Sequence, residues 1–184
     1  MGRPVVLTKG QIPTKEELQN MKSIYLAGGC FWGVQKYFDQ FDGVVLTEVG
    51  YANGPDEAPS YEEVCASSGH AETVQVGYDE KRISLAELLG FYFAVIDPLS
   101  VNRQGNDVGV QYRTGIYYTD EAQLPKIQAV CDRVAQAAGQ PLAVEVAPLK
   151  NFFSAEEYHQ KYLDKNPGGY CHIPRQMFEL GRAR

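Results

Sequence analysis

The sequence has no long hydrophobic run, no excess of positive charge and no dense set of cysteines. No stretch approaches the roughly 18 consecutive apolar residues of a transmembrane helix. Residues 1–20 mix charged side chains with short apolar pieces, so the hydrophobic block of a secretory signal is missing. The 17 Lys and Arg residues are scattered among 23 Asp and Glu residues, and the net charge of −6 argues against a nucleic-acid or membrane partner. We therefore expect a cytoplasmic protein, monomeric by default.

Cysteine and histidine are also too sparse for the common disulfide and metal frameworks. The 4 cysteines lie too far apart for the disulfide pattern of a small secreted domain, and no C-x-x-C pair is present. The 3 histidines fall at neither zinc-finger nor H-E-x-x-H spacing, so no metal site is expected. The residues concerned are Cys30, Cys65, Cys131, Cys171, His70, His159 and His172.

What the chain does contain is enough apolar material for one core. It is 44% apolar and 11% aromatic over 184 residues, which predicts a single domain spanning 1–184. Capping boxes and helical periodicity predict helices at 14–20, 30–40, 61–66, 84–96, 124–138 and 154–165. Apolar alternation and β-branched runs predict strands at 22–28, 43–52, 72–78, 111–118 and 142–147. This order predicts an α+β fold, a layered sheet with helices packed mainly on one face.

Three segments stand out from this pattern. Residues 72–78 alternate clearly, which predicts a half-buried strand with Val74, Val76 and Tyr78 on one face. Residues 97–110 are a long polar stretch, and a loop of that length inside a compact domain is usually functional. Residues 170–184 show no periodicity and are expected to form an irregular tail.

The run Gly28-Gly29-Cys30-Phe31-Trp32-Gly33 lies between a predicted strand and a predicted helix. A cysteine at a helix start faces the positive end of the helix dipole, which favours the thiolate. Phe31 and Trp32, the only tryptophan, would wall an apolar pocket beside that sulfur. The pattern predicts a nucleophile, although a buried small residue at a tight turn is the simpler reading of a cysteine taken alone.

The other cysteines differ in their setting. Cys131 lies on the apolar stripe of its predicted helix and Cys65 follows Val64 in a short one, so both are expected to pack in the core. Cys171 follows Gly168-Gly169-Tyr170 in the aperiodic tail, where a mobile arm is expected. One activated and one mobile cysteine suit a cycle of sulfenic acid formation followed by disulfide formation.

Glu72 begins a predicted strand from the polar turn Gly69-His70-Ala71. If its carboxylate enters the pocket of Phe31 and Trp32, burial raises its pKa and makes it a proton donor. An exposed glutamate at a strand end is the alternative.

Several further polar residues have both a structural and a functional interpretation. A buried tyrosine is most often a core residue, yet its phenol can donate a hydrogen bond inside an apolar wall. His159 and Tyr162 are three residues apart on a predicted helix and would share a face. Asp107 would brace its own Gly-Asn-Asp turn. The tyrosines considered are Tyr61, Tyr112 and Tyr162.

The run Gly29-Cys30-Phe31-Trp32-Gly33 resembles the signature pentapeptide of the class A peptide methionine sulfoxide reductases. The similarity extends from about residue 22 to about residue 173, which is most of the chain. The other matching pieces are Tyr61 with Glu63-Val64-Cys65, Gly69-His70-Ala71-Glu72, Gln104-Gly105-Asn106-Asp107, Gln111-Tyr112-Arg113, His159-Gln160-Lys161-Tyr162-Leu163, and Asn166-Pro167 with Gly169-Tyr170-Cys171.

The resemblance implies reduction of the S epimer of methionine sulfoxide, free or in proteins, in a ferredoxin-like α+β fold without metal or organic cofactor. It implies that Cys30 attacks the sulfoxide sulfur while the substrate methyl group lies against Phe31 and Trp32. Cys171 would then resolve the sulfenic acid, and thioredoxin would reduce the Cys30–Cys171 disulfide. Because no cysteine follows Cys171, a second relay disulfide is not expected, and with no room for a class B domain the R epimer should not be a substrate.

The resemblance also implies roles for the polar residues. Glu72 would hydrogen-bond the sulfoxide oxygen together with Tyr61 and Tyr112 and would supply the proton, which fits the need to protonate a poor leaving oxygen. The main-chain groups of the substrate would be held by Asp107, His159 and Tyr162.

Two other functions remain open from the residues alone. A cysteine hydrolase would use Cys30 with His70 or His159 as base, although the order Cys-Phe-Trp does not match a papain-like segment. A non-catalytic aromatic binding module is the other, but the Gly-x₄-Gly run continues as Val34-Gln35 and therefore fails as a phosphate loop.

Overall fold

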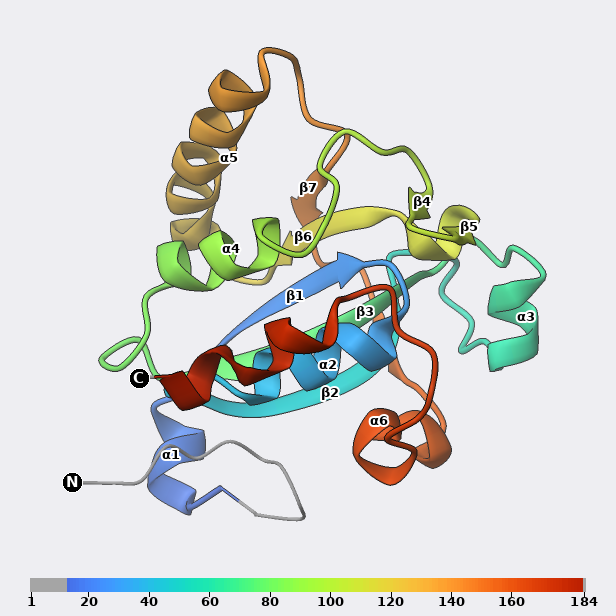
Figure 1. Ribbon diagram of the computed structural model, residues 1–184, viewed down its shortest axis with the longest axis horizontal. Helices are drawn as coiled ribbons and strands as arrows, with labels where there is room; N and C mark the ends of the chain where they lie inside the picture. The colour runs from blue at the N-terminus through green and yellow to red at the C-terminus, as the bar shows by residue number, and fades with distance from the viewer. Residues whose placement is uncertain (1–12, 184) are drawn as a thin grey trace.

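The computed structural model describes residues 13–183 and contains a six-stranded mixed sheet and a separate two-stranded hairpin (Figure 1). The order in the sheet is β7-β6-β1-β3-β2-β8, with β6 and β7 parallel and the other neighbours antiparallel. The strands of the sheet are β1 (Lys22–Gly28), β2 (Val44–Ala52), β3 (Ala71–Tyr78), β6 (Thr114–Tyr118), β7 (Glu145–Pro148) and β8 (Phe152–Ser154). The hairpin consists of β4 (Arg103–Gln104) and β5 (Asp107–Val108).

The helices begin largely where the capping signals predict. Thr14, Ser60 and Ser84 each accept a hydrogen bond from the backbone of a glutamate three residues later, which completes three capping boxes. The α-helices are α1 (Lys15–Gln19), α2 (Phe31–Asp39), α3 (Tyr61–Cys65), α4 (Leu85–Phe93), α5 (Leu124–Ala138) and α6 (Tyr162–Lys165). Short 3-10 helices span Val110–Tyr112, Glu121–Gln123, Glu157–His159 and Arg175–Ala183.

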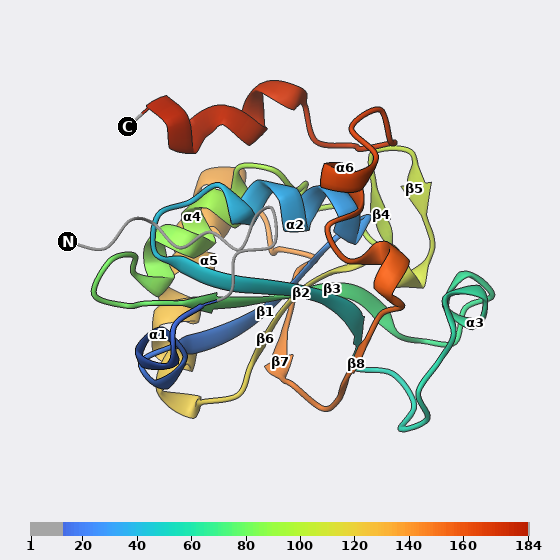
Figure 2. The same cartoon turned by 90° about the horizontal axis from the view of Figure 1, so that it is seen from below.

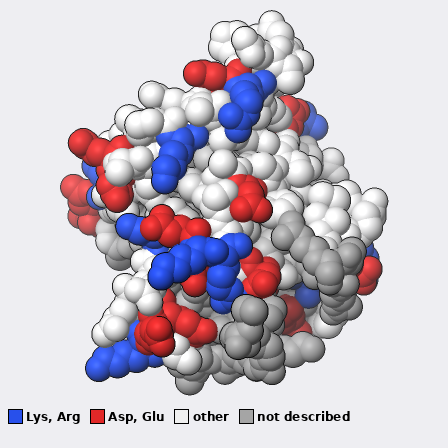
Figure 3. All heavy atoms as spheres, turned by 90° about the vertical axis from the view of Figure 1, so that its left-hand side faces the viewer, with Lys and Arg blue, Asp and Glu red and all other residues white. Residues whose placement is uncertain are grey.

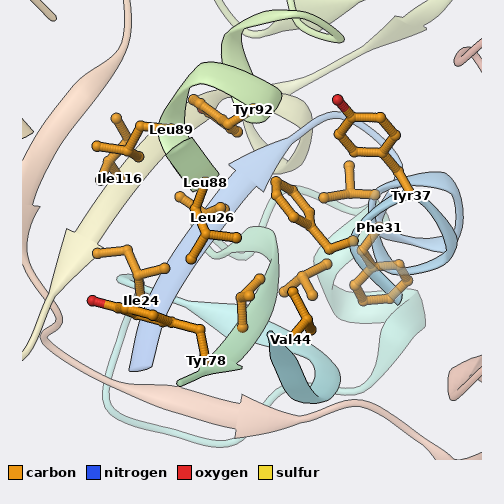
Figure 4. Packing of buried hydrophobic residues seen from close by; sticks show 14 of the residues in the cluster. Ile24, Leu26, Phe31, Tyr37, Val44, Tyr78, Leu88, Leu89, Tyr92 and Ile116 are labelled. Carbon is orange, nitrogen blue, oxygen red and sulfur yellow. The ribbon is translucent and has the colours of Figure 1, made fainter. Parts of the chain in front are cut away.

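Helices α2 and α4 cover the same face of the sheet (Figure 2). The main core lies between them and the strands, where Leu26 of β1, Phe31 of α2 and Leu88 of α4 converge (Figure 4). A smaller apolar cluster covers the opposite face. Its buried members are Ala27, Ala52, Ala71 and Tyr117. The predicted α+β class is confirmed.

Strand β3 is buried on both faces, so the prediction of a half-buried strand is wrong. It lies between β1 and β2 and pairs with both. Its second face is covered by the smaller cluster, and Thr73 is fully buried there with its hydroxyl donating to the Ala71 carbonyl at 2.9 Å. Alternation of apolar and polar residues cannot reveal that a second apolar layer will cover the polar face.

The segment predicted as one helix over 154–165 is broken into three pieces. Ser154 ends β8, an unpredicted strand, and its hydroxyl donates to Glu48 rather than capping a helix. A 3-10 turn follows, and Lys161 then adopts a left-handed conformation with φ of +56° before α6 begins. The physical cause is Gln160, whose side chain accepts from Val49 N–H at 3.0 Å and donates to Val49 C=O at 2.9 Å. These tertiary hydrogen bonds outweigh the local helical preference.

Other boundaries differ by a few residues. Helix α4 ends at Phe93, short of the predicted 96, and β6 starts at Thr114 because residues 110–112 form a 3-10 turn. Strand β7 starts at Glu145, three residues late. The tail is not irregular throughout, since a 3-10 helix over Arg175–Ala183 returns to α2, where Gln40 donates to the Met177 carbonyl at 2.6 Å.

Within residues 13–183, no helix has the length and apolar character needed to cross a bilayer. On the face shown in Figure 3, Lys and Arg side chains are interspersed with Asp and Glu. The observation on a secretory signal concerns residues 1–20, of which 1–12 lie outside the described residues.

Candidate active site

Cys30 lies where β1 ends and α2 begins, as the N-cap residue of that helix. The turn needs Gly29, which has φ of +87° and whose added β-carbon would stand 2.8 Å from Gln104 Cβ and 2.9 Å from His172 Cε1. Gln104 and His172, from two other segments of the chain, are therefore packed closely against the turn that carries Cys30. Cys30 itself is only 6% exposed.

Burial keeps the resting Cys30 as a thiol. Desolvation raises the pKa of Cys30 well above its usual value, and the nearby Glu72, Asp107 and Cys171 raise it further. The opposing contribution is a hydrogen bond from the Trp32 backbone N–H. The prediction that the helix start favours the thiolate is therefore wrong for the resting site, because one helix N-terminus does not compensate for loss of water.

Glu72, at the start of β3, is 1% exposed and directly connected to the nucleophile turn. Its Oε1 accepts the Phe31 backbone N–H at 3.2 Å, while Oε2 has no partner among the described residues. Burial raises the pKa of Glu72 to about 8, although the Phe31 N–H lowers it in part. At neutral pH this side chain is mainly a carboxylic acid with a proton to donate, in agreement with the sequence prediction.

Tyr61 at the start of α3 and Tyr112 in a 3-10 turn lie within electrostatic range of Glu72. Burial raises the pKa of both phenols, so both retain their protons. Cys65 shares a hydrogen bond with Tyr61 and is exposed, so the prediction that it packs in the core is wrong. Glu72 and Tyr112 lie within electrostatic range of Cys30, and Tyr61 lies within range of Glu72, so three protonated oxygen donors are grouped near the nucleophile.

The two residues that follow Cys30, Phe31 and Trp32, belong to a cluster of aromatic rings that forms a wall. Trp32 stacks on Tyr162 with ring centroids 3.7 Å apart and an interplanar angle of 10°. Its Nε1–H donates to His159 Nδ1 at 2.9 Å, and the fully buried His159 also contacts Phe31 at 5.2 Å between ring centroids. Because Nδ1 accepts, the proton of the neutral imidazole sits on Nε2, and burial lowers the pKa of His159. His159 and Tyr162 do not share a helix face as predicted, but they meet at Trp32.

A buried ion pair connects the segment between His159 and Tyr162 to α2. Asp39, two turns after Trp32 on α2, is 2% exposed and its Oδ2 lies 2.6 Å from Lys161 Nζ. Thr47 donates to the other carboxylate oxygen at 2.5 Å, and Gln35 accepts the Lys161 backbone N–H at 2.7 Å. Lys161 lies between His159 and Tyr162, so the pair ties the wall to α2 and β2.

We expect Lys161→Met to lower the free energy of unfolding by about 3 kcal/mol at neutral pH, because the buried Asp39 carboxylate loses its counter-charge. Urea unfolding measures the loss. The control is Lys36→Met, which breaks the ion pair between Lys36 and Asp164. These side chains are 36% and 26% exposed, so this variant should lower the free energy of unfolding by less than about 1 kcal/mol. Equal losses in the two variants would contradict the prediction.

Asp107, in β5, supports the nucleophile turn. Its carboxylate accepts the Cys30 backbone N–H, and its Oδ2 lies 3.4 Å from the Tyr170 hydroxyl and 3.8 Å from His172 Nδ1. Gln104 closes the same loop, since its side chain donates to Asp97 C=O at 3.0 Å and accepts Asp97 N–H at 2.8 Å. Gln104, Tyr170 and His172 are not among the predicted site residues, although the structure places them beside this turn. Their positions beside Asp107 and Cys171 in the chain were the available signal.

The second sulfur lies close to the first. A β-carbon at Gly33 would overlap Cys171 Sγ, so only glycine at this position leaves room for the sulfur. Cys171 Sγ therefore packs against the first turn of α2, the helix for which Cys30 is the N-cap. Ile173 N–H donates to Cys171 Sγ at 3.2 Å, and burial raises the pKa of this thiol. The expected mobile arm is packed in the resting state. Cys131 contacts the main core, as predicted.

The two histidines considered as hydrolase bases are occupied elsewhere. His70 has its ring nitrogens 2.8 Å from Ser68 Oγ and 2.8 Å from the Pro55 carbonyl. The Nδ1 of His159 is held by Trp32. Among residues 13–183, no group of three His, Cys, Asp or Glu side chains is placed to hold a metal ion. The arrangement instead combines a buried thiol, a protonated acid, an aromatic wall and a second thiol.

Comparisons with known proteins agree with this arrangement. The sequence model of the family described as "Peptide methionine sulfoxide reductase" matches residues 22–182. The peptide methionine sulfoxide reductase MsrA of Clostridium acetobutylicum is 55% identical over 160 residues, covering 86% of this chain and 99% of the relative. The crystal structure of Mxr1 from Saccharomyces cerevisiae in reduced form has a TM-score of 0.80 at 40% identity, covering 85% and 92% of the two chains. Mxr1 in complex with Trx2 has a TM-score of 0.57 at 28% identity, covering 85% and 93%.

Proposed function

The chain belongs to the peptide methionine sulfoxide reductase family, and on that premise we propose that it reduces the S epimer of methionine sulfoxide, free or in proteins, through Cys30. One observation carries the assignment of roles. The backbone of Phe31, the residue after Cys30, donates to Glu72, and burial keeps Glu72 protonated. A single hydrogen bond therefore connects the proton donor Glu72 to the residue next to the nucleophile.

The first step is attack on the sulfoxide with proton transfer to its oxygen. The substrate methyl group packs against Phe31 and Trp32, and its oxygen accepts hydrogen bonds from Glu72, Tyr61 and Tyr112. As Cys30 Sγ bonds to the substrate sulfur, the Glu72 proton passes to the oxygen and the Cys30 thiol proton passes to the Glu72 carboxylate. The hydroxyl then transfers to the Cys30 sulfur as the substrate sulfur–oxygen bond and the transient bond between the two sulfurs break, so that methionine leaves and a Cys30 sulfenic acid remains.

The remaining polar residues position these groups. Asp107 holds the Cys30 backbone N–H, while His159 and Tyr162 hold the indole of Trp32. The resemblance predicts that all three residues hold main-chain groups of the substrate. Their contacts favour support of the nucleophile and the wall, with any substrate contact made in addition.

The second half of the cycle restores the thiol. Cys171 attacks the Cys30 sulfenic acid, a disulfide forms and water leaves. A dithiol then reduces the disulfide to two thiols and is itself oxidised. Thioredoxin is the proposed reductant, because a structure of the related Mxr1 with Trx2 exists.

Further properties belong to the same proposal. The order β6-β1-β3-β2, all antiparallel, with α2 and α4 in the connections supports a ferredoxin-like classification of the central strands. We also propose one catalytic domain over 1–184 with its core at 22–173, acting as a monomer in the cytoplasm without a nucleic-acid partner.

The test is methionine formation from resolved epimers with and without thioredoxin. We expect the S epimer to be turned over repeatedly with thioredoxin, and the R epimer not to react. Cys171→Ser should release about one methionine per enzyme and then stop, because the sulfenic acid is formed but not resolved. No reaction with the S epimer would refute the function, and equal multiple-turnover rates for wild type and Cys171→Ser would refute the relay.

A further inference from the structure

Exposed apolar side chains gather around the candidate site. Residues 13–183 expose six large apolar or aromatic side chains, and five of these lie in segments that also carry site residues. Val101 and Val108, the most exposed at 73% and 66%, belong to the loop of Asp107. The full set is Leu18, Leu99, Val101, Val108, Tyr158 and Tyr170. Apolar groups concentrated on one part of a surface usually mark an interaction site.

The contacts of neighbouring residues place these segments close to Cys30. Val108 follows Asp107, whose carboxylate accepts the Cys30 backbone N–H. Arg103 pairs with Val108, and Gly109 N–H donates to the Asn102 carbonyl at 2.8 Å. These contacts place the residues that follow Val101 next to Val108. Tyr170 contacts the same aspartate at 3.4 Å.

One further exposed aromatic residue, Tyr158, lies beside the aromatic wall. The Tyr158 ring lies 4.0 Å from the ring of His159, which binds Trp32. Figure 1 shows the β4–β5 hairpin on one side of the junction between β1 and α2, and α6 on the other side. The segments that carry the exposed apolar residues therefore approach the junction between β1 and α2 from two directions.

We propose that Val101, Val108 and Tyr158 form an apolar rim that binds the residues flanking methionine sulfoxide in a polypeptide substrate. The proposal rests on the function proposed above. Consecutive Cα atoms of a polypeptide are about 3.8 Å apart. When a methionine sulfoxide side chain is inserted beside Cys30, the residues before and after it must therefore lie on the protein surface around the site. Free methionine sulfoxide has no such neighbours, and the rim therefore discriminates in favour of peptides with apolar flanks.

The expected effect follows from the area available. Covering two valine side chains that are largely exposed should raise kcat/KM for an apolar-flanked peptide about tenfold over a Gly/Ser-flanked one. The probes are two pentapeptides, Leu-Val-Met(O)-Val-Leu and Ser-Gly-Met(O)-Gly-Ser, each with the S-sulfoxide. The variant Val101→Ser/Val108→Ser should reduce the ratio of their kcat/KM values to within about twofold. General damage to the protein would lower both values and leave the ratio unchanged.

Leu18→Ser is the matched control, because Leu18 is also exposed but lies on α1, outside the site segments. Its ratio should equal that of wild type. The proposal is wrong if wild type shows no preference, if the double variant retains the preference, or if Leu18→Ser removes it equally.

A binding measurement separates this proposal from the proposed reaction. Cys30→Ser protein is titrated with each pentapeptide while the fluorescence of Trp32, the only tryptophan, is recorded. About tenfold tighter binding of the apolar peptide supports the rim even if no turnover is found in the wild type. Equal affinities would overturn the rim while leaving the reduction of free methionine sulfoxide untouched.

Discussion

Cys30→Ser is expected to abolish methionine sulfoxide reduction completely, in single as well as multiple turnover. A serine hydroxyl is a far weaker nucleophile than sulfur and cannot be oxidised to a sulfenic acid, so the transfer of oxygen has no acceptor. The remaining thiols do not replace it, since Cys171 lies on Gly33 rather than beside Glu72. Quantifying methionine in a stoichiometric reaction with excess S epimer measures the loss.

Retained binding makes this result specific to chemistry. The Cys30→Ser variant should still quench or shift Trp32 fluorescence on addition of the sulfoxide, because the aromatic wall does not depend on the sulfur. Methionine produced at close to one equivalent per enzyme would show that another residue is the nucleophile.

Glu72→Gln is expected to slow the reduction step by about 100- to 10,000-fold, because glutamine keeps the shape but has no acidic proton. Binding of the sulfoxide should change much less, since the amide can still hydrogen-bond to its oxygen. Rapid-quench measurement of the first turnover reports the rate. Glu72→Asp, which keeps the acid, is the control and should retain more activity. An unchanged rate constant in Glu72→Gln would remove Glu72 from this role.

The same substitution should stabilise the protein at alkaline pH. The pKa of Glu72 is about 8 in the fold and has a usual value of 4.5. The folded state therefore holds the proton between pH 4.5 and pH 8 while the unfolded state has released it, so wild-type stability falls as pH rises through this window. The full penalty, about 5 kcal/mol, is present above it. Glutamine escapes this penalty but leaves its amide nitrogen without a partner, at a cost of about 2 kcal/mol.

Urea unfolding at pH 5 and pH 8 tests this linkage. We expect Glu72→Gln to gain stability relative to wild type on going from pH 5 to pH 8, with a net advantage of about 2 kcal/mol at the higher pH. A difference between variant and wild type that does not change with pH would contradict it. A residue that destabilises the fold where it ionises is typical of a functional site rather than of a structural one.

Local sequence signals predicted the elements that depend on neighbours in the chain. The helix starts at Thr14, Ser60 and Ser84 were predictable because each cap is completed by a glutamate three residues on. The strand β1 ends at Gly28 as expected, and Gly139 ends α5 in a left-handed conformation. The predictions that failed involve distant partners. Gln160 bonds to β2, and the second face of β3 is covered by residues from other strands.

For the site, the sequence by itself determined the chemistry available: a thiol at a helix start with two aromatic residues after it, a glutamate at a strand start and a second thiol near the end. Only the tertiary structure decided how these groups behave. Exclusion of water by segments far apart in the chain makes Glu72 an acid and keeps Cys30 a thiol, and the space above Gly33 places Cys171 within the same turn. Desolvation and close approach are properties of the assembled fold, so no spacing within the sequence could reveal them.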